Sequence, residues 1–272
     1  QEKMRGNARL LLLHLFSAGL VFFAALLLYY LQGYEAGQQE YENIRSIFQA
    51  KEGNRKYIQE GNEKGNKEAN THKTPSLQES HLSQPPPYKI LEESLKTANP
   101  DYEFWLIIPG TSINYPVVQN KEEGYYLDHT FSKSKNSCGT LFIQKESKLF
   151  EDDNTIIFGH NRKDGSMFGQ LKQYRDPEFY SQHSQIWIYR KGRWYQGEIF
   201  SCQIWKENDY RIYQKSFHTP EERQTYLETV KTREMYPTNI IPEEDQLLIT
   251  LTTCYGTSQR MIVQAVLMCY TE

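Results

Sequence analysis

The chain lacks the excess of positive charge that nucleic-acid-binding proteins carry. Its 31 lysine and arginine residues are outnumbered by 34 aspartate and glutamate residues, which leaves a formal net charge of −3 at pH 7. No nucleic-acid partner is therefore predicted. Internal repeats are also missing. The 272 residues suffice for one domain with extensions.

Cysteine is scarce, and no cysteine spacing resembles a C-x-x-C metal site. The chain has four: Cys138, Cys202, Cys254 and Cys269. Outside a membrane an even count allows two disulfides, although a domain of this size needs none for stability. Cys202 and Cys269 lie inside apolar strand-like runs, which indicates small buried side chains. The sequence assigns no role to Cys138.

No cofactor and no metal site is predicted. Loop carboxylates have the chemistry to bind calcium, but we interpret them as solvated charges rather than ligands. They are Glu122, Glu123, Glu151, Asp152 and Asp153.

The chain is polar overall, but residues 8–31 form one long apolar run, interrupted only by Arg9, His14 and Ser17. Its length is that of a helix that crosses a bilayer. A cleaved signal peptide usually has a shorter apolar core, and a buried core helix is rarely apolar all round. We therefore expect an uncleaved signal-anchor.

The charges on either side of this run predict its orientation. Cations precede it and carboxylates follow it: Lys3, Arg5 and Arg9 before, Glu35, Glu40 and Glu42 after. Because cations favour the cytoplasmic side, we expect a single-pass protein of the cell membrane. Its N-terminus would be cytoplasmic and everything after residue 32 extracellular.

Three regions are predicted along the chain. Residues 1–34 form the cytoplasmic tip and the membrane anchor. Residues 35–87 form a polar extracellular stalk, partly disordered, in which the spacing of Tyr41, Ile44 and Phe48 indicates a short juxtamembrane helix. Residues 88–272 form the folded domain.

The folded domain is predicted to be mainly β with a few helices. Eight short runs rich in aromatic and β-branched residues, separated by turn residues, favour an antiparallel barrel or sandwich. The runs are Phe104–Ile108, Ile113–Val118, Thr140–Ile143, Thr155–Phe158, Gln185–Tyr189, Trp194–Ile204, Gln246–Thr253 and Arg260–Met268.

Helix signals occur at three places in this domain. Apolar spacing indicates a short helix that begins near Ile90 and stops before Asn99-Pro100. A second is expected over Met167–Tyr174. The third begins at the capping box of Thr219, with proline at its first position, and is expected to reach about Met235.

Three residues at strand ends suggest covalent thiol chemistry. Cys254 ends one apolar run, Arg260 begins the next, and His160 closes an upstream run after Gly159. A thiolate is a strong nucleophile, and imidazole exchanges protons near neutral pH. Arginine keeps its proton, so Arg260 is suited to stabilising an oxyanion rather than acting as a base.

Strand alternation refines this placement. If residues 246–254 form a strand, Thr250, Thr252 and Cys254 share one face. We expect Thr252 to line the groove of the thiol and Leu251 to pack in the core. A lone cysteine or histidine at such a position is more often structural. The three residues together, with the arginine at this spacing, are more specific.

At these residues the sequence resembles the sortases. The family pattern is T-L-x-T-C with an arginine on the next strand, and this chain reads T-L-T-T-C-Y-G-T-S-Q-R over residues 250–260. Features similar to the class B branch are Phe158–Phe168, Tyr115–Gln119, Gly124–Leu127 and the long helix after Thr219. The resemblance covers about residues 88–270 and implies an eight-stranded sortase-type β-barrel.

The resemblance also implies an activity. Class B sortases are cysteine transpeptidases of Gram-positive bacteria that cleave a C-terminal sorting motif of the Asn-Pro-x-Thr-x type. By position, Cys254 attacks the threonine carbonyl, His160 protonates the leaving amine, and Arg260 stabilises the oxyanion. Thr252, Tyr126 and Leu127 are implied as substrate-binding residues.

The implied partners are secreted proteins that bear the sorting signal. A peptidoglycan cross-bridge amine or a pilin lysine would accept them, and the membrane would be contacted through residues 8–31.

Two other functions remain open from the residues alone. A secreted cysteine endopeptidase uses the same pair of side chains, although the papain-type and caspase-type motifs are absent. The His-Gly-Cys-x-Arg arrangement of the L,D-transpeptidases is also missing. A non-catalytic, membrane-tethered scaffold leaves the coincidence of His160, Cys254 and Arg260 unexplained.

Overall fold

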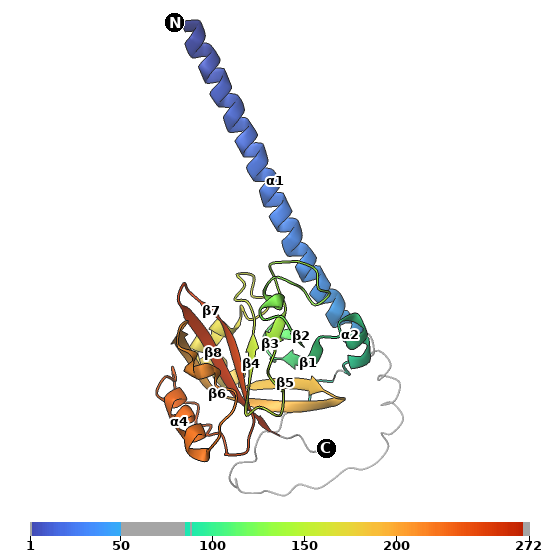
Figure 1. The fold of residues 1–272 in the computed structure, drawn as a ribbon, viewed down its shortest axis with the longest axis vertical. Coiled ribbons are helices and arrows are strands. Elements are labelled where there is room, and N and C mark those ends of the chain that lie inside the picture. The colour runs from blue at the N-terminus through green and yellow to red at the C-terminus, as the bar shows by residue number, and fades with distance from the viewer. Residues whose placement is uncertain (1, 50–84, 88, 269–272) are drawn as a thin grey trace, which may run out of the picture.

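The structure is a computed structural model that describes residues 2–49, 85–87 and 89–268. A long N-terminal helix, α1 (Glu2–Gln49), leads to a closed barrel of eight strands in the order β1-β2-β3-β4-β7-β8-β6-β5 (Figure 1). The predicted fold class, an eight-stranded barrel with few helices after an apolar N-terminal helix, is confirmed.

The strands coincide with the predicted runs to within a few residues at each end. They are β1 (Tyr102–Ile107), β2 (Asn114–Gln119), β3 (Leu141–Ile143), β4 (Asn154–Phe158), β5 (Gln185–Arg190), β6 (Arg193–Lys206), β7 (Leu248–Tyr255) and β8 (Gln259–Met268).

The barrel is mixed rather than antiparallel, which corrects the prediction. β2 pairs with β3 in parallel, and β4 pairs with β7 in parallel. Parallel neighbours need a crossover connection between them. The segment between β4 and β7 supplies a long one, because it contains β5, β6 and the helix α4 (Pro220–Lys231).

Two apolar clusters lie on opposite faces of β7. Ile249 and Leu251 point into the barrel and are fully buried there, as predicted for Leu251. Leu248, on the other face, packs in a second cluster with Tyr226 and Val230 of α4. At Leu248 the outer face of β7 is therefore covered by a helix rather than by solvent.

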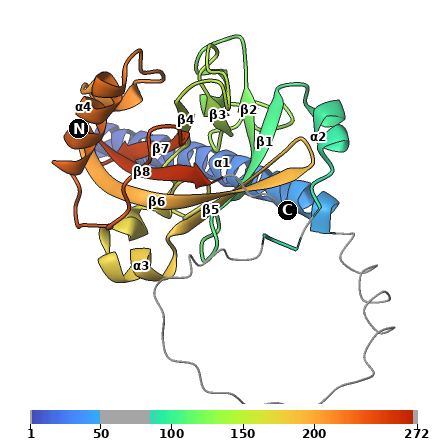
Figure 2. The same ribbon diagram turned by 90° about the horizontal axis from the view of Figure 1, so that it is seen from below.

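The helices differ in detail from the predicted ones. α2 (Glu92–Ala98) ends before Pro100, as predicted, and α4 ends at Lys231 rather than near Met235. α2 and α4 lie at opposite sides of the barrel (Figure 2). Short 3-10 helices, η3 (Tyr125–Leu127) and η5 (Tyr210–Tyr213), lie in the loops.

The predicted helix Met167–Tyr174 is wrong in extent. The chain forms a 3-10 turn, η4 (Leu171–Arg175), and then α3 (Pro177–Gln182). Asp176 caps α3 by accepting a hydrogen bond from the amide of Glu178 at 2.9 Å, with proline at the first position. An aspartate followed by proline is a helix-start signal, and it marks α3 in the sequence.

α1 runs without a break from the apolar run through residue 49, past the predicted boundary between residues 34 and 35. Its described part includes a segment of mean hydropathy 2.2 that makes no buried contact, as expected of a helix that crosses a membrane. The predicted stalk lies mostly outside the described residues. Tyr41 and Ile44, however, are buried against the barrel.

A buried polar cluster joins β4, β7 and α4. Asn154 is fully buried, donates to the carbonyl of Gln214 at 2.9 Å and accepts from the hydroxyl of Thr250 at 2.8 Å. The hydroxyl of Tyr226 accepts from the amide of Gln264 at 2.7 Å and donates to the carbonyl of Ile212 at 3.1 Å. Each polar group here is desolvated and depends on its partner.

Asn154→Ala should therefore destabilise the domain. The substitution leaves buried polar groups of Thr250 and Gln214 without their amide partner, which costs about 1–3 kcal/mol in the free energy of unfolding. Urea unfolding followed by tryptophan fluorescence measures the loss. Gln224→Ala, at an exposed position on α4, is the control. Equal stability of the two variants would contradict the cluster's role.

Candidate active site

The parallel pairing of β4 and β7 places the ends of the two strands at one edge of the barrel. Phe158, the last residue of β4, lies opposite Thr252 of β7. The amide of Gly159 donates to the carbonyl of Thr252 at 3.2 Å, and the hydroxyl of Thr253 donates to the carbonyl of Gly159 at 2.7 Å. His160 and Cys254 follow immediately, so both emerge at this edge.

The residue after the histidine extends the connection. The side-chain amide of Asn161 donates to the backbone carbonyl of Cys254 at 2.8 Å. Three hydrogen bonds thus tie residues 159–161 to residues 252–254. They limit how far the two segments move apart.

Cys254 and Arg260 face each other across the β7–β8 hairpin. The register pairs them directly, and Gly256 allows the tight turn with a φ of +64°. Nη1 of Arg260 donates to Sγ of Cys254, while Nη2 pairs with the carboxylate of Glu207. The Cys254 side chain is exposed to solvent. A nucleophile and a cation therefore lie in contact with each other where solvent reaches the thiol.

His160 is held by its Nε2, which lies 2.6 Å from the backbone carbonyl oxygen of Leu127. A carbonyl oxygen only accepts, so Nε2 carries the hydrogen in this contact. Nδ1 is then the nitrogen free to take or give a proton. The amide of Phe168 also donates to the carbonyl of His160 at 3.0 Å.

Gly159 is required by close packing behind the histidine. A Cβ at this position would lie 2.4 Å from Cδ2 of Leu141 and 2.7 Å from Cδ2 of Phe168. No side chain fits there without displacing the core. Close packing therefore explains why the residue before His160 is a glycine.

The structure places the three residues predicted to bind substrate in different surroundings. Leu127 is 48% exposed and lies beside His160. Tyr126 is 1% exposed, and its hydroxyl donates to Asp101 at 2.7 Å, so its side chain offers no surface to a substrate. Thr252 shares the face of Cys254 but is 1% exposed, because Tyr213 lies over it with the two hydroxyls 3.1 Å apart.

Sequence reasoning missed several residues at this edge. Glu207 comes from the end of β6, which pairs with the start of β8 and brings the carboxylate to Arg260. Nothing in the local sequence marks it. Asn161 follows the histidine directly. Its amide side chain at a predicted strand end could have marked it as a site residue. Tyr213 comes from η5, whose position depends on the tertiary fold.

The other described cysteines are free thiols and lie far from solvent. Cys138 and Cys202 are both buried. Burial raises the pKa of the Cys138 thiol to about 11 and that of Cys202 to about 12. The expectation that Cys202 is a small buried side chain is confirmed. Cys269 lies outside the described residues.

Metal-binding geometry is not found in the part of the chain that the structure describes. No group of three or more histidine, cysteine, aspartate or glutamate side chains is placed there to hold an ion.

Comparison with known proteins decides the family. The sortase domain family model matches residues 106–268, which include His160, Cys254 and Arg260. The chain belongs to the sortase family. The match begins at β1 and ends at the last residue of β8.

The similar proteins are sortases of class B. Sortase B of Listeria monocytogenes is 36% identical over 162 residues, 59% of this chain and 65% of that protein. Sortase B of Staphylococcus aureus is 29% identical over 77% of this chain and 86% of that protein. The X-ray structure of Clostridium perfringens sortase B superposes with a TM-score of 0.63 at 31% identity and covers 65% of this chain and 100% of that one. The predicted resemblance to class B sortases is confirmed.

The exposures and pKa shifts predict the order in which the thiols of this sortase react. At pH 7.5 a limiting amount of iodoacetamide should label Cys254 before Cys138 and Cys202. A raised pKa keeps the two buried thiols neutral until the pH approaches about 11 and about 12, so they supply little thiolate below that range. Peptide mass mapping measures the order. Labelling of Cys138 as fast as Cys254 in the folded protein would contradict the site's geometry.

Proposed function

We propose that this class B sortase is a membrane-anchored cysteine transpeptidase that joins secreted proteins to an amine of the cell surface. The observation that carries the proposal is the exposed thiol of Cys254, in contact with Arg260, at the barrel edge from which His160 also emerges. Membership of the sortase family supports the activity class.

In the first step Cys254 gives its thiol proton to His160, and its sulfur attacks the carbonyl carbon of the threonine in a sorting motif of the Asn-Pro-x-Thr-x type. The negative charge that develops on the carbonyl oxygen is stabilised by the guanidinium of Arg260. The C–N bond then breaks, and His160 gives a proton to the leaving amine. A thioester between Cys254 and the threonine remains.

In the second step an amine attacks the thioester carbonyl. His160 takes the proton that the amine loses, a new amide forms, and the sulfur of Cys254 leaves as thiolate. The candidate acceptors are a peptidoglycan cross-bridge amine and a pilin lysine. Two similar sortase B structures, 29% and 28% identical to this chain, are complexes with a substrate (from Staphylococcus aureus) and with triglycine. The second complex favours testing oligoglycine first.

The apolar helix α1 supports a location for the enzyme. We propose that its apolar part crosses the membrane with residues 1–7 on the cytoplasmic side and the barrel outside. Cations before residue 10 and carboxylates from Glu35 onward support this orientation. The transpeptidase would then meet its substrates as they are secreted.

The function is tested with the full chain in detergent and a fluorogenic Asn-Pro-x-Thr-x peptide. We expect cleavage without acceptor and an amide product when triglycine is added, because the thioester partitions between water and amine. Cys254→Ala should lose turnover by at least about 1,000-fold. Cys202→Ala, in the barrel wall, is the control.

The other candidate functions give different outcomes. Hydrolysis that no amine diverts to transfer product would indicate an endopeptidase. Absence of reaction with every sorting peptide would indicate a scaffold. Turnover that survives Cys254→Ala would rule out the mechanism.

A further inference from the structure

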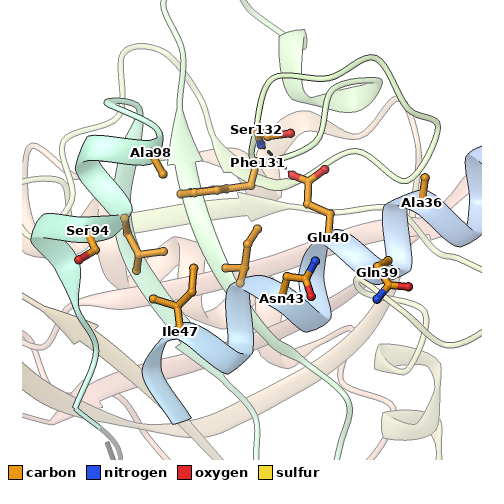
Figure 3. A pocket seen from close by; sticks show the side chains of 11 residues that line it. Ala36, Gln39, Glu40, Asn43, Ile47, Ser94, Ala98, Phe131 and Ser132 are labelled. Atoms are coloured by element: carbon orange, nitrogen blue, oxygen red, sulfur yellow. Dashed lines mark hydrogen bonds between the residues drawn. The ribbon is translucent and has the colours of Figure 1, made fainter. Parts of the chain in front are cut away.

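The last turns of α1 are docked on the catalytic barrel. Tyr41 is 3% exposed, and its ring meets that of Tyr115 edge-on with the centroids 5.3 Å apart. Figure 3 shows the same stretch of helix, from Ala36 to Ile47, beside Phe131 and the helix α2. The helix that carries the membrane anchor is therefore packed against the folded domain.

α1 contacts the loop of residues 128–140 at several points. The side-chain amide of Asn136 donates to the carbonyl of Gly33 at 2.6 Å, and the amide of Ser132 donates to Glu40 at 2.8 Å (Figure 3). Gly37 lies so close to this loop that a Cβ on it would be 2.7 Å from Sγ of Cys138. A larger residue at 37 would push the helix away.

This loop packs against the side chain of His160 through Gly139. The hydroxyl of Tyr41 donates to the carbonyl of Gly139 at 2.6 Å. Gly139 has a φ of +60°, and a Cβ on it would lie 3.1 Å from Cδ2 of His160 and 2.9 Å from the carbonyl oxygen of Leu127. That carbonyl is the one that holds Nε2 of His160. A shift of Gly139 would therefore change the packing against both the His160 ring and the carbonyl that holds it.

α1 also reaches the segment that follows the histidine. Gln38 donates to the carboxylate of Asp164 at 3.0 Å. The guanidinium carbon of Arg162 lies 4.5 Å from the centroid of the Tyr34 ring, a cation–π contact. The helix thus contacts the chain on both sides of His160.

We propose that the docked part of α1, residues 33–47, positions His160 for catalysis, and that Tyr41 is its main positioning residue. The inference rests on the proposed function. α1 is continuous, and Leu31 and Tyr41 are ten residues apart, about 15 Å along a helix. The anchor that holds the enzyme at the membrane therefore also completes its active site.

Tyr41→Phe in the full chain, in detergent, tests the proposal. The ring stays packed, but the hydrogen bond to the carbonyl of Gly139 and the 2.9 Å contact with the hydroxyl of Thr140 are both lost. We expect kcat to fall about 10-fold with KM changed less than about 2-fold, because proton transfer rather than binding is impaired. The pH dependence of kcat should also change, which a loss of stability alone would not cause.

Tyr180→Phe is the matched control. Its hydroxyl also donates to a backbone carbonyl, that of Ile199 at 3.0 Å, but it lies on α3 and touches neither loop around His160. It should lose similar thermal stability and keep its kcat. If both tyrosine variants lowered kcat equally, with unchanged pH profiles, Tyr41 would have only a structural role.

A second pair of variants tests the docking itself. Gly37→Leu places a side chain where the loop leaves no room, whereas a Cβ at Gly19, in the apolar run outside the docked segment, meets nothing within 4 Å. We expect Gly37→Leu to lower kcat as Tyr41→Phe does, and Gly19→Leu to keep it. Wild-type kcat in Gly37→Leu would overturn the proposal.

Failure of this inference can be told apart from failure of the proposed function. The NMR titration of the His160 imidazole reports its surroundings without any substrate. A titration shifted by Tyr41→Phe and unchanged by Tyr180→Phe would support the positioning role even in a chain that turned over no sorting peptide. Identical titrations in both variants would count against it whatever the activity.

Discussion

The parallel pairing of β4 with β7 is the constraint on which the site depends. Parallel strands end at the same edge of a sheet, so the residues after β4 and those at the end of β7 meet. An antiparallel pairing would send His160 and Cys254 to opposite ends of the barrel. Backbone and side-chain bonds from residues 159–161 to residues 252–254 hold this edge together.

The hairpin between β7 and β8 brings the arginine to the thiol. A short turn returns the chain so that Arg260 lies opposite Cys254, and Glu207, which directly follows β6, pairs with the other side of the guanidinium. The fork geometry of arginine allows it to contact sulfur and carboxylate at once. Three neighbouring strands, β6, β7 and β8, therefore position one cation at the thiol.

Local sequence signals were sufficient for the eight strands and for placing His160 and Cys254 at strand ends. Short runs rich in aromatic and β-branched residues, separated by turn residues, predicted the strands. Strand pairing was not accessible in this way, because parallel contacts between β4 and β7 join segments about 90 residues apart. Alternation also predicted that Thr252 lies on the same face of β7 as Cys254. It could not show that this side chain is shielded from solvent, because Tyr213, which packs over it, comes from another part of the chain.

The juxtamembrane helix shows a similar limit. The spacing of Tyr41 and Ile44 indicated a helix, and the structure has one there. A polar segment beyond a membrane span nevertheless looks like a stalk, because the partner that buries those two side chains lies far along the chain. The folded unit therefore includes the last turns of α1, which precede the predicted start of the folded domain at residue 88.

The most direct test of the account is whether His160 and Cys254 share one electrostatic environment. NMR spectra of the His160 ring in the full chain at one pH, compared between the wild type and Cys254→Ala, measure this. The account predicts that removing the thiol shifts the ring signals, because the parallel pairing of β4 and β7 brings the two residues to one edge of the barrel. Unchanged ring signals would show that the barrel edge does not bring them together, and would contradict the account.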